Sequence, residues 1–252
     1  MFRTAIWFIL VSAALVLQIG PVQPVSADDA GVWTPPAWLM DPTTGENYSR
    51  LEKRKAITAQ KAQRPQRADI EQLKKIVHYH ASQLTYPENS NLPKTVIDRY
   101  LSDLLSSLTT VPAREEMIKE LMVIVPDLLT HPDLIVQENA VLMLVHSSVT
   151  PVNIGAKLPP KPFDPAYKLF VQILEDSSKH WVVRNAAVLG LRRILQDGNL
   201  GNPEKSAIAE ALLKALNDAA GEKWWFRFRI VETLGEVQRI VLVTGAPTII
   251  EA

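Results

Sequence analysis

Three stretches of the chain share one pattern at a nearly constant spacing. They are residues 139–144, 185–190 and 230–235, each largely apolar. When Leu144, Gly190 and Gly235 are aligned, the copies lie 46 and then 45 residues apart. A period in this range is typical of arrays of helical hairpins, in which each unit buries its apolar face only by stacking on its neighbours. The repeat therefore predicts an all-α chain whose surface binds partners.

The composition supports a folded helical protein and excludes several functions. Of 252 residues, 47% are hydrophobic, which is enough for a large core. Lys and Arg together equal Asp and Glu at 27 each, so no net positive field draws the chain to nucleic acid, and a nucleic-acid partner is not expected. There is no cysteine, which excludes disulfides and thiolate metal sites.

The first 27 residues have the pattern of an export signal. A short basic start is followed by an apolar run from Ala5 to Leu17, and residues 25–27 are small, as at a cleavage site. The apolar run is shorter than the ~20 residues of a spanning helix, and no later segment approaches that length. We therefore expect export to the periplasm or beyond, with no membrane span after cleavage. An uncleaved anchor is the alternative.

Residues 28–67 are predicted to form a flexible, Pro-containing basic arm. Between Arg50 and Arg67 there are seven basic residues against one acid, Glu52. Such a charge run is usually a solvated segment, but it also suits peripheral contact with an anionic surface or an acidic partner. Trp33 and Trp38 are candidates for fixing this arm to the folded part.

From residue 68 onward the apolar spacing is helical. Residues 68–110 are predicted to form a capping helical hairpin, 111–242 the repeats and 243–252 a short tail. Prolines at expected helix starts and Gly or Asp at expected breaks set the limits of each element. The first helices of the three repeats are expected at 112–129, 165–176 and 203–218, and the second helices at 133–146, 180–196 and 223–241.

The second helices resemble HEAT repeats over roughly residues 112–241. The family motif is an apolar residue and Arg, then paired small apolar residues, then Leu-Gly. It is matched by Phe226, Arg227, Ile230, Val231, Leu234 and Gly235. In the middle copy Val182 stands in place of the Arg and Arg184 follows two residues later, and the first copy lacks both Arg and Gly. The resemblance implies a right-handed α-solenoid and a structural role for Arg227 in a polar ladder between repeats. Armadillo-like arrays remain an alternative.

The segment 222–229 is the strongest candidate for partner binding. It combines Trp, Phe and Arg, and Trp and Arg are frequent interface hot spots. Related positions one repeat earlier add a Trp and an Arg. The candidate partner-binding residues are Trp181, Arg184, Trp224, Trp225, Arg227 and Arg229. The alternative is that the aromatic side chains fill the core between repeats while the arginines are solvated or bound to neighbouring repeats.

A second candidate is the insert at residues 147–162, which interrupts the period. It holds four prolines and Lys157. Insertions in helical arrays emerge on one edge, often the binding edge, although a plain connector would have the same composition.

Catalytic and metal-binding patterns are weak. His78 and His80 lie two residues apart and so point in different directions on a helix, which does not suit one metal ion, and we expect one exposed and one half-buried ring. The chain has no Gly-x-Ser-x-Gly turn and no Gly-rich phosphate loop. HEAT-like hydroxylases carry His-Glu ligand pairs, and none occurs here. No catalytic residue, metal or cofactor is therefore predicted.

Together these observations predict an exported, non-catalytic HEAT-like scaffold that holds a protein or peptide partner on its solenoid surface. The first alternative is an envelope enzyme or enzyme subunit that uses the groove as a substrate site, marked by a pocket where acids and histidines converge. The second is a spacer between a surface-binding arm and the tail. Fold resemblance alone cannot choose among them, because solenoids carry many functions.

Overall fold

The chain is all-α. The computed structural model describes residues 53–86, 89–219, 221 and 223–237. In this part of the chain there is no β-strand, only two isolated bridges in one loop. The helices are α3 (Lys53–Gln60), α4 (Arg67–Gln83), α5 (Pro93–Leu104), α6 (Val111–Leu128), α7 (Leu134–His146), α8 (Tyr167–Glu175), α9 (Trp181–Asp197), α10 (Asn202–Asp218) and α11 (Trp224–Leu234).

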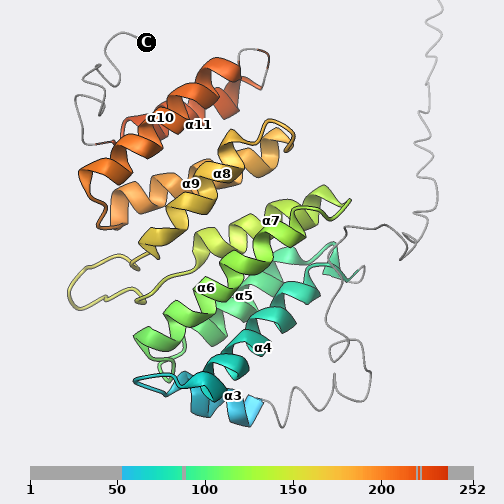
Figure 1. The fold of residues 1–252 in the computed structure, drawn as a ribbon, viewed down its shortest axis with the longest axis vertical. Helices are drawn as coiled ribbons and strands as arrows, with labels where there is room; N and C mark the ends of the chain where they lie inside the picture. Colours follow the sequence, from blue (N-terminus) through green and yellow to red (C-terminus); the bar gives the residue numbers. More distant parts are fainter. Residues whose placement is uncertain (1–52, 87–88, 220, 222, 238–252) are drawn as a thin grey trace, which may run out of the picture. The chain divides into compact units, whose positions relative to one another are not determined.

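The helices pack as consecutive pairs that contact the next pair along the chain. The pairs are α4 with α5, α6 with α7, α8 with α9 and α10 with α11 (Figure 1). Between pairs, α4 contacts α6, α5 contacts α7, α7 contacts α9, α8 contacts α10 and α9 contacts α11. One continuous set of buried apolar side chains runs through these contacts, from α3 to α11. Each pair thus buries its apolar surface against its neighbours.

Local sequence signals set the helix starts. Pro93, Pro112 and Pro203 each lie in the first turn of a helix, where the missing N–H of proline costs no hydrogen bond. Asp133 caps α7, because its Oδ1 accepts a hydrogen bond of 2.8 Å from the backbone N–H of Ile135. The observed bounds of the six repeat helices agree with the predicted ones within two residues, with one exception.

The exception is α11, which was predicted to run to residue 241 and ends at Leu234. Gly235 is its C-cap residue, and glycine is a poor continuation of a helix because its backbone loses the most freedom on folding. Residues 238–252, which include the predicted tail, lie outside the described residues.

The prediction of a flexible arm over residues 28–67 is wrong for its last part. Helix α3 packs on α4, and Ala56 and Ala59 are buried there. Two hydrogen bonds from Thr110 fix the end of α3 to the start of α6: its backbone N–H donates to Gln60 O (2.8 Å), and its hydroxyl donates to Ala62 O (2.6 Å). Two alanines one turn apart give this basic helix an apolar side. Residues 1–52, with the predicted export signal, lie outside the described residues.

Two buried arginines connect successive helices through hydrogen bonds. Arg114 and Arg184 are each the fourth residue of a helix, and each donates from Nε, at 3.0 Å, to a carbonyl ten residues earlier, at the end of the preceding helix. Arg114 also donates to the carbonyls of Ser106 (3.0 Å) and Val149 (3.2 Å). Burial lowers the pKa of Arg114. These guanidinium groups satisfy carbonyls that a helix end leaves free.

Within the described residues, no helix has both the length and the apolar character needed to cross a membrane.

Candidate functional site

The predicted partner-binding residues divide into a packed group and an exposed group. Trp181 of α9 and Trp225 of α11 meet edge to face, with ring centroids 4.5 Å apart. Arg184 is buried, and its guanidinium carbon lies 5.3 Å from the centroid of the Phe226 ring. Such aromatic and cation–π contacts stabilise packing between helices. These contacts hold α9 against α11 and favour the core alternative for the three residues.

The other three predicted residues lie at or near the surface of α11. Trp224 is 76% exposed and Arg227 is also exposed. Arg229 is partly buried and donates from Nη1 to Glu232 Oε2 at 2.7 Å. The hydrogen bond from Arg229 lowers the pKa of the Glu232 carboxyl, and the same carboxylate lies 2.8 Å from Nη1 of Arg192 on α9. Arg229 therefore has a structural contact, whereas Arg227, for which the resemblance implied one, faces solvent.

Three large apolar side chains form an exposed row on α11, which we call the α11 ridge. They are Trp224, Phe228 and Val231, exposed by 76%, 53% and 52%. Their spacing of four and then three residues places them on one face of the helix. The opposite face carries the buried Phe226 and Ile230. Phe228 and Val231 were not among the predicted site residues, although the sequence places them four and seven residues after Trp224.

Among the described residues, the charged side chains at the N-terminal end of the α11 ridge are basic. Lys223 is the N-cap residue of α11 and is exposed, and Arg227 lies one turn further on. The first turn holds no acidic residue, and the N-cap makes no side-chain hydrogen bond. Basic side chains at a helix N-terminus oppose the helix dipole, so this arrangement costs stability and favours a nearby carboxylate.

The insert at 147–162 is an ordered loop that projects from the helices (Figure 1). Its two arms pair at Thr150 with Lys161 and at Asn153 with Leu158. Ile154, near its tip, is 83% exposed. The base of the loop is fixed by Arg193 of α9, which donates to Val145 O, Ser147 O, Ser148 Oγ and Pro160 O. The insert is thus more than a plain connector in structure, and it ends in an apolar tip.

Arg193→Ala is expected to release this loop. The substitution removes four donated hydrogen bonds, and the free energy of unfolding should fall by about 2 kcal/mol, because each net bond contributes about 0.5–1.5 kcal/mol and part of the site stays hydrated. Limited trypsin digestion should cut after Lys157 at least ~10-fold faster, since local opening exposes the backbone. Arg192→Ala is the matched neighbour and should leave this rate unchanged. Equal rates in both variants would contradict the fastening role.

The two histidines of the first hairpin have separate partners. His78 Nε2 lies 2.8 Å from Glu120 Oε1, and His80 Nε2 lies 3.0 Å from Asp103 Oδ2. One half-buried ring was expected, and His78 is partly buried; the expectation of an exposed ring was wrong, because His80 is buried, at 4% exposed. Contacts with different helices draw the two rings inward. In the part of the chain that the structure describes, no cluster of three His, Asp or Glu side chains suits a metal ion.

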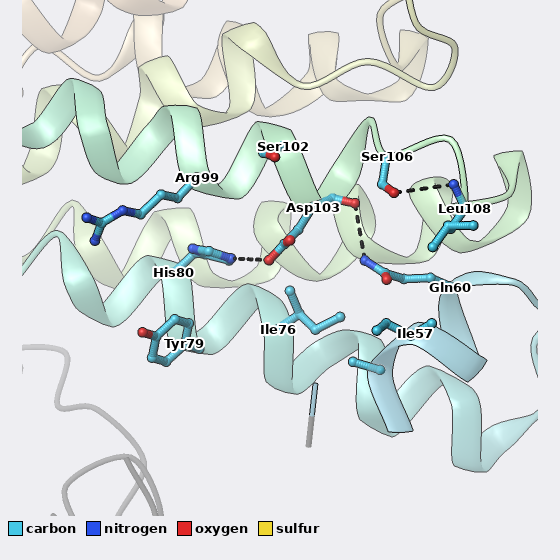
Figure 2. Close-up of a pocket in the computed structure, with 11 residues that line it drawn as sticks. Ile57, Gln60, Ile76, Tyr79, His80, Arg99, Ser102, Asp103, Ser106 and Leu108 are labelled. Atoms are coloured by element: carbon cyan, nitrogen blue, oxygen red, sulfur yellow. Dashed lines mark hydrogen bonds and ion pairs between the residues drawn. The ribbon is translucent and has the colours of Figure 1, made fainter. Parts of the chain in front are cut away.

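A cavity of about 520 Å³ lies between α3, α4 and α5, and we call it the α3–α5 cavity. This volume is within the usual range of small-molecule sites. Figure 2 shows Arg99 and Tyr79 towards one end and Ile57 and Leu108 towards the other, with the His80–Asp103 pair between them. The remaining lining residues are Ala56, Gln60, Ile76, Ser102 and Ser106. An acid and a histidine do converge here, as the enzyme alternative requires.

The contacts of the His80–Asp103 pair are nevertheless those of a structural pair, which connects α4 to α5. Nε2 of His80 is engaged by Asp103, and Nδ1 is buried without a partner among the described residues. The ring also makes edge contacts with Tyr79 and Tyr100, at centroid distances of 5.3 and 5.8 Å. A general base must reach the proton that it removes. In this structure Nε2 of His80 faces Asp103 and Nδ1 is buried.

No family model, no curated protein and no solved structure matches the chain. Function is therefore inferred from the chain's own residues.

Proposed function

We propose that the chain is an exported, HEAT-like, right-handed α-solenoid that binds a partner protein without catalysis, through the α11 ridge. The partner that fits is an amphipathic helix with acidic residues beside its apolar side. The observation that carries this proposal is the row formed by Trp224, Phe228 and Val231, each more than half exposed on one face of a helix. The succession of helix pairs, each contacting the next, supports the solenoid.

An exposed apolar face such as that of α11 is unusual in a stacked helical array. Outer helices of such arrays normally carry polar residues, because a bare apolar face is poorly soluble. Large exposed apolar rows usually mark interaction sites. Trp is also the side chain most enriched among binding hot spots. An amphipathic partner helix would carry apolar side chains at the same four-and-three spacing, so its apolar face could pack along the α11 ridge.

Charge complementarity defines the partner further. Lys223 and Arg227 give the N-terminal end of the ridge a positive charge with no acidic residue in the first turn of α11. A carboxylate of the partner would complement both side chains and the helix dipole. A second copy of the chain fits less well, because antiparallel pairing of two ridges about Phe228 brings the two Arg227 side chains together. Pairing with residues 238–252 of the same chain is the other outcome to test.

Export and the basic segment complete the proposal. The apolar run at residues 5–17 supports export to the periplasm or beyond. The basic residues between 50 and 67 support peripheral contact with an anionic surface, which would hold the array near the envelope.

The double variant Trp224→Ser/Phe228→Ser is expected to lose the partner. Two hot-spot side chains at about 2 kcal/mol each correspond to a ~1,000-fold weaker Kd. The partner would be captured by cross-linking in cells, identified by mass spectrometry and then titrated as a purified protein. Because both side chains are exposed, the helicity and midpoint of urea unfolding should stay close to wild type.

Val123→Ser is the matched control, since Val123 is 65% exposed on α6, away from α11. It should bind the partner like wild type. Equal affinity of the double variant and the control would contradict the proposal. Loss of a dimer in light scattering, or a gain of affinity on removing residues 238–252, would assign the ridge to a second copy or to that segment.

A further inference from the structure

We propose that the α3–α5 cavity binds an organic anion with an apolar chain, its head group at Arg99 and its chain towards Ile57 and Leu108. This site is separate from the α11 ridge and does not depend on the function proposed for it. The cavity has the volume of a small-molecule site, about 520 Å³. Its lining changes from charged to apolar along its length (Figure 2).

The charged end presents a guanidinium group. Arg99 is exposed, and no hydrogen bond or ion pair joins it to any other described residue. The carboxylate of Asp103, one turn away on α5, is turned to His80, which it contacts at 3.0 Å. Arg99 extends away from that pair in Figure 2. A planar guanidinium binds carboxylate or phosphate oxygens through paired hydrogen bonds, so the natural ligand of this end is an anion.

The apolar end is formed by side chains that the fold leaves accessible. Ile57 of α3 and Leu108, after α5, are 36% and 46% exposed, although both line the cavity. Ile76 and Ala56 form the buried wall beside them. Covering this surface with an alkyl chain contributes free energy in proportion to the apolar area buried. The ligand class that satisfies both ends is an amphipathic monoanion.

The walls of the cavity are fixed before any ligand enters. Gln60 Nε2 donates to Asp103 O at 3.2 Å, which joins α3 to α5. His80 is held by Asp103 and by the rings of Tyr79 and Tyr100. A preformed site loses little free energy to ordering when it binds.

Isothermal titration calorimetry on the full chain tests the proposal with ligands that share one alkyl chain. Sodium decanoate, below its critical micelle concentration, is expected to bind with one site, and decyltrimethylammonium is expected to bind at least ~10-fold more weakly, because only the anion complements Arg99. Vesicles of phosphatidylglycerol form the second arm. Binding to vesicles without binding to decanoate would overturn the proposal and indicate a membrane-surface contact instead.

Two variants locate the ligand. Arg99→Gln should weaken decanoate binding at least ~10-fold by removing the charged partner, and Leu108→Asp should abolish it by placing an acid at the apolar end. Both residues are exposed, so helicity should be unchanged. Lys168→Gln, at an exposed position on α8 outside the cavity, is the control and should bind decanoate like wild type. Unchanged affinity in Arg99→Gln or Leu108→Asp, or no binding of decanoate to wild type, would overturn the proposal.

Discussion

Gly190→Val is expected to lower the free energy of unfolding by about 3 kcal/mol, as overpacking of a tight core does. A Cβ atom at Gly190 would lie 2.6 Å from the ring of Phe170, well inside van der Waals contact. Phe170 is itself 1% exposed, so the ring has no free space into which to move. The contact joins α9 to α8 in the centre of the array, and separating the two helices would also open the packing of α7 on α9.

Gly235→Val is the matched control because the same sequence motif ends in Gly235 one copy later. There an added Cβ would come no closer than 3.3 Å, to a backbone oxygen, and Gly235 is exposed at the end of α11. This variant should change the free energy of unfolding by less than about 0.5 kcal/mol. Urea unfolding followed by circular dichroism measures both. If the two variants were equally stable, the close packing of α8 on α9 at Gly190 would be wrong.

Arg114→Met is the second substitution with a large expected effect, a loss of about 3 kcal/mol. Arg114 donates to the carbonyls of Leu104, Ser106 and Val149 and is 6% exposed. Methionine keeps much of the side-chain volume but leaves those three carbonyls without this donor, at about 1 kcal/mol each. Because Leu104 ends α5, Ser106 lies just after it and Val149 lies near the start of the insert, the variant should also speed hydrogen exchange in both segments.

Arg227→Met tests whether the effect comes from the position or from the residue type. Arg227 is likewise the fourth residue of its helix but is exposed, so the variant should unfold within about 0.5 kcal/mol of wild type. Hydrogen exchange and urea unfolding on the same samples separate local from global effects. If Arg114→Met lowered the free energy of unfolding no more than Arg227→Met does, the proposed contribution of the Arg114 hydrogen bonds between successive helices would be contradicted.

The helices themselves could be predicted from the sequence because their signals are local. Prolines in first turns and the spacing of apolar residues do not depend on tertiary contacts, and they set the bounds of α6 to α10 closely. The role of an individual arginine depends on what packs beside it. Aligning the Leu-Gly pairs places Arg184 with Arg229, whereas the helix starts at Trp181 and Trp224 place Arg184 with Arg227. Only the packing of α9 on α11 shows that Arg184 is buried.

Only part of the candidate site could be predicted, because the exposure of a side chain also depends on what packs beside it. Trp225 and Trp224 are adjacent and equally apolar, yet one packs against Trp181 and the other faces solvent. Which of these two neighbours is buried depends on the rotation of α11 about its axis. Because residues 224–226 are all aromatic, the sequence does not indicate which of them faces the core. The α3–α5 cavity was missed because α3 was predicted to be part of a flexible arm. Its wall residues come from segments more than 40 residues apart in the chain, such as Gln60 and Asp103.

Site-specific photo-cross-linking in cells tests the proposed function most directly. A benzoylphenylalanine side chain would replace Phe228 in the α11 ridge or, as the control, Val123 on α6; both positions are exposed. Position 228 should give one discrete product with a different protein, mapped by mass spectrometry to an apolar helical segment with acidic residues, and position 123 should not. Products with the chain itself alone, the same products at both positions, or none at position 228 would contradict a partner-binding α11 ridge.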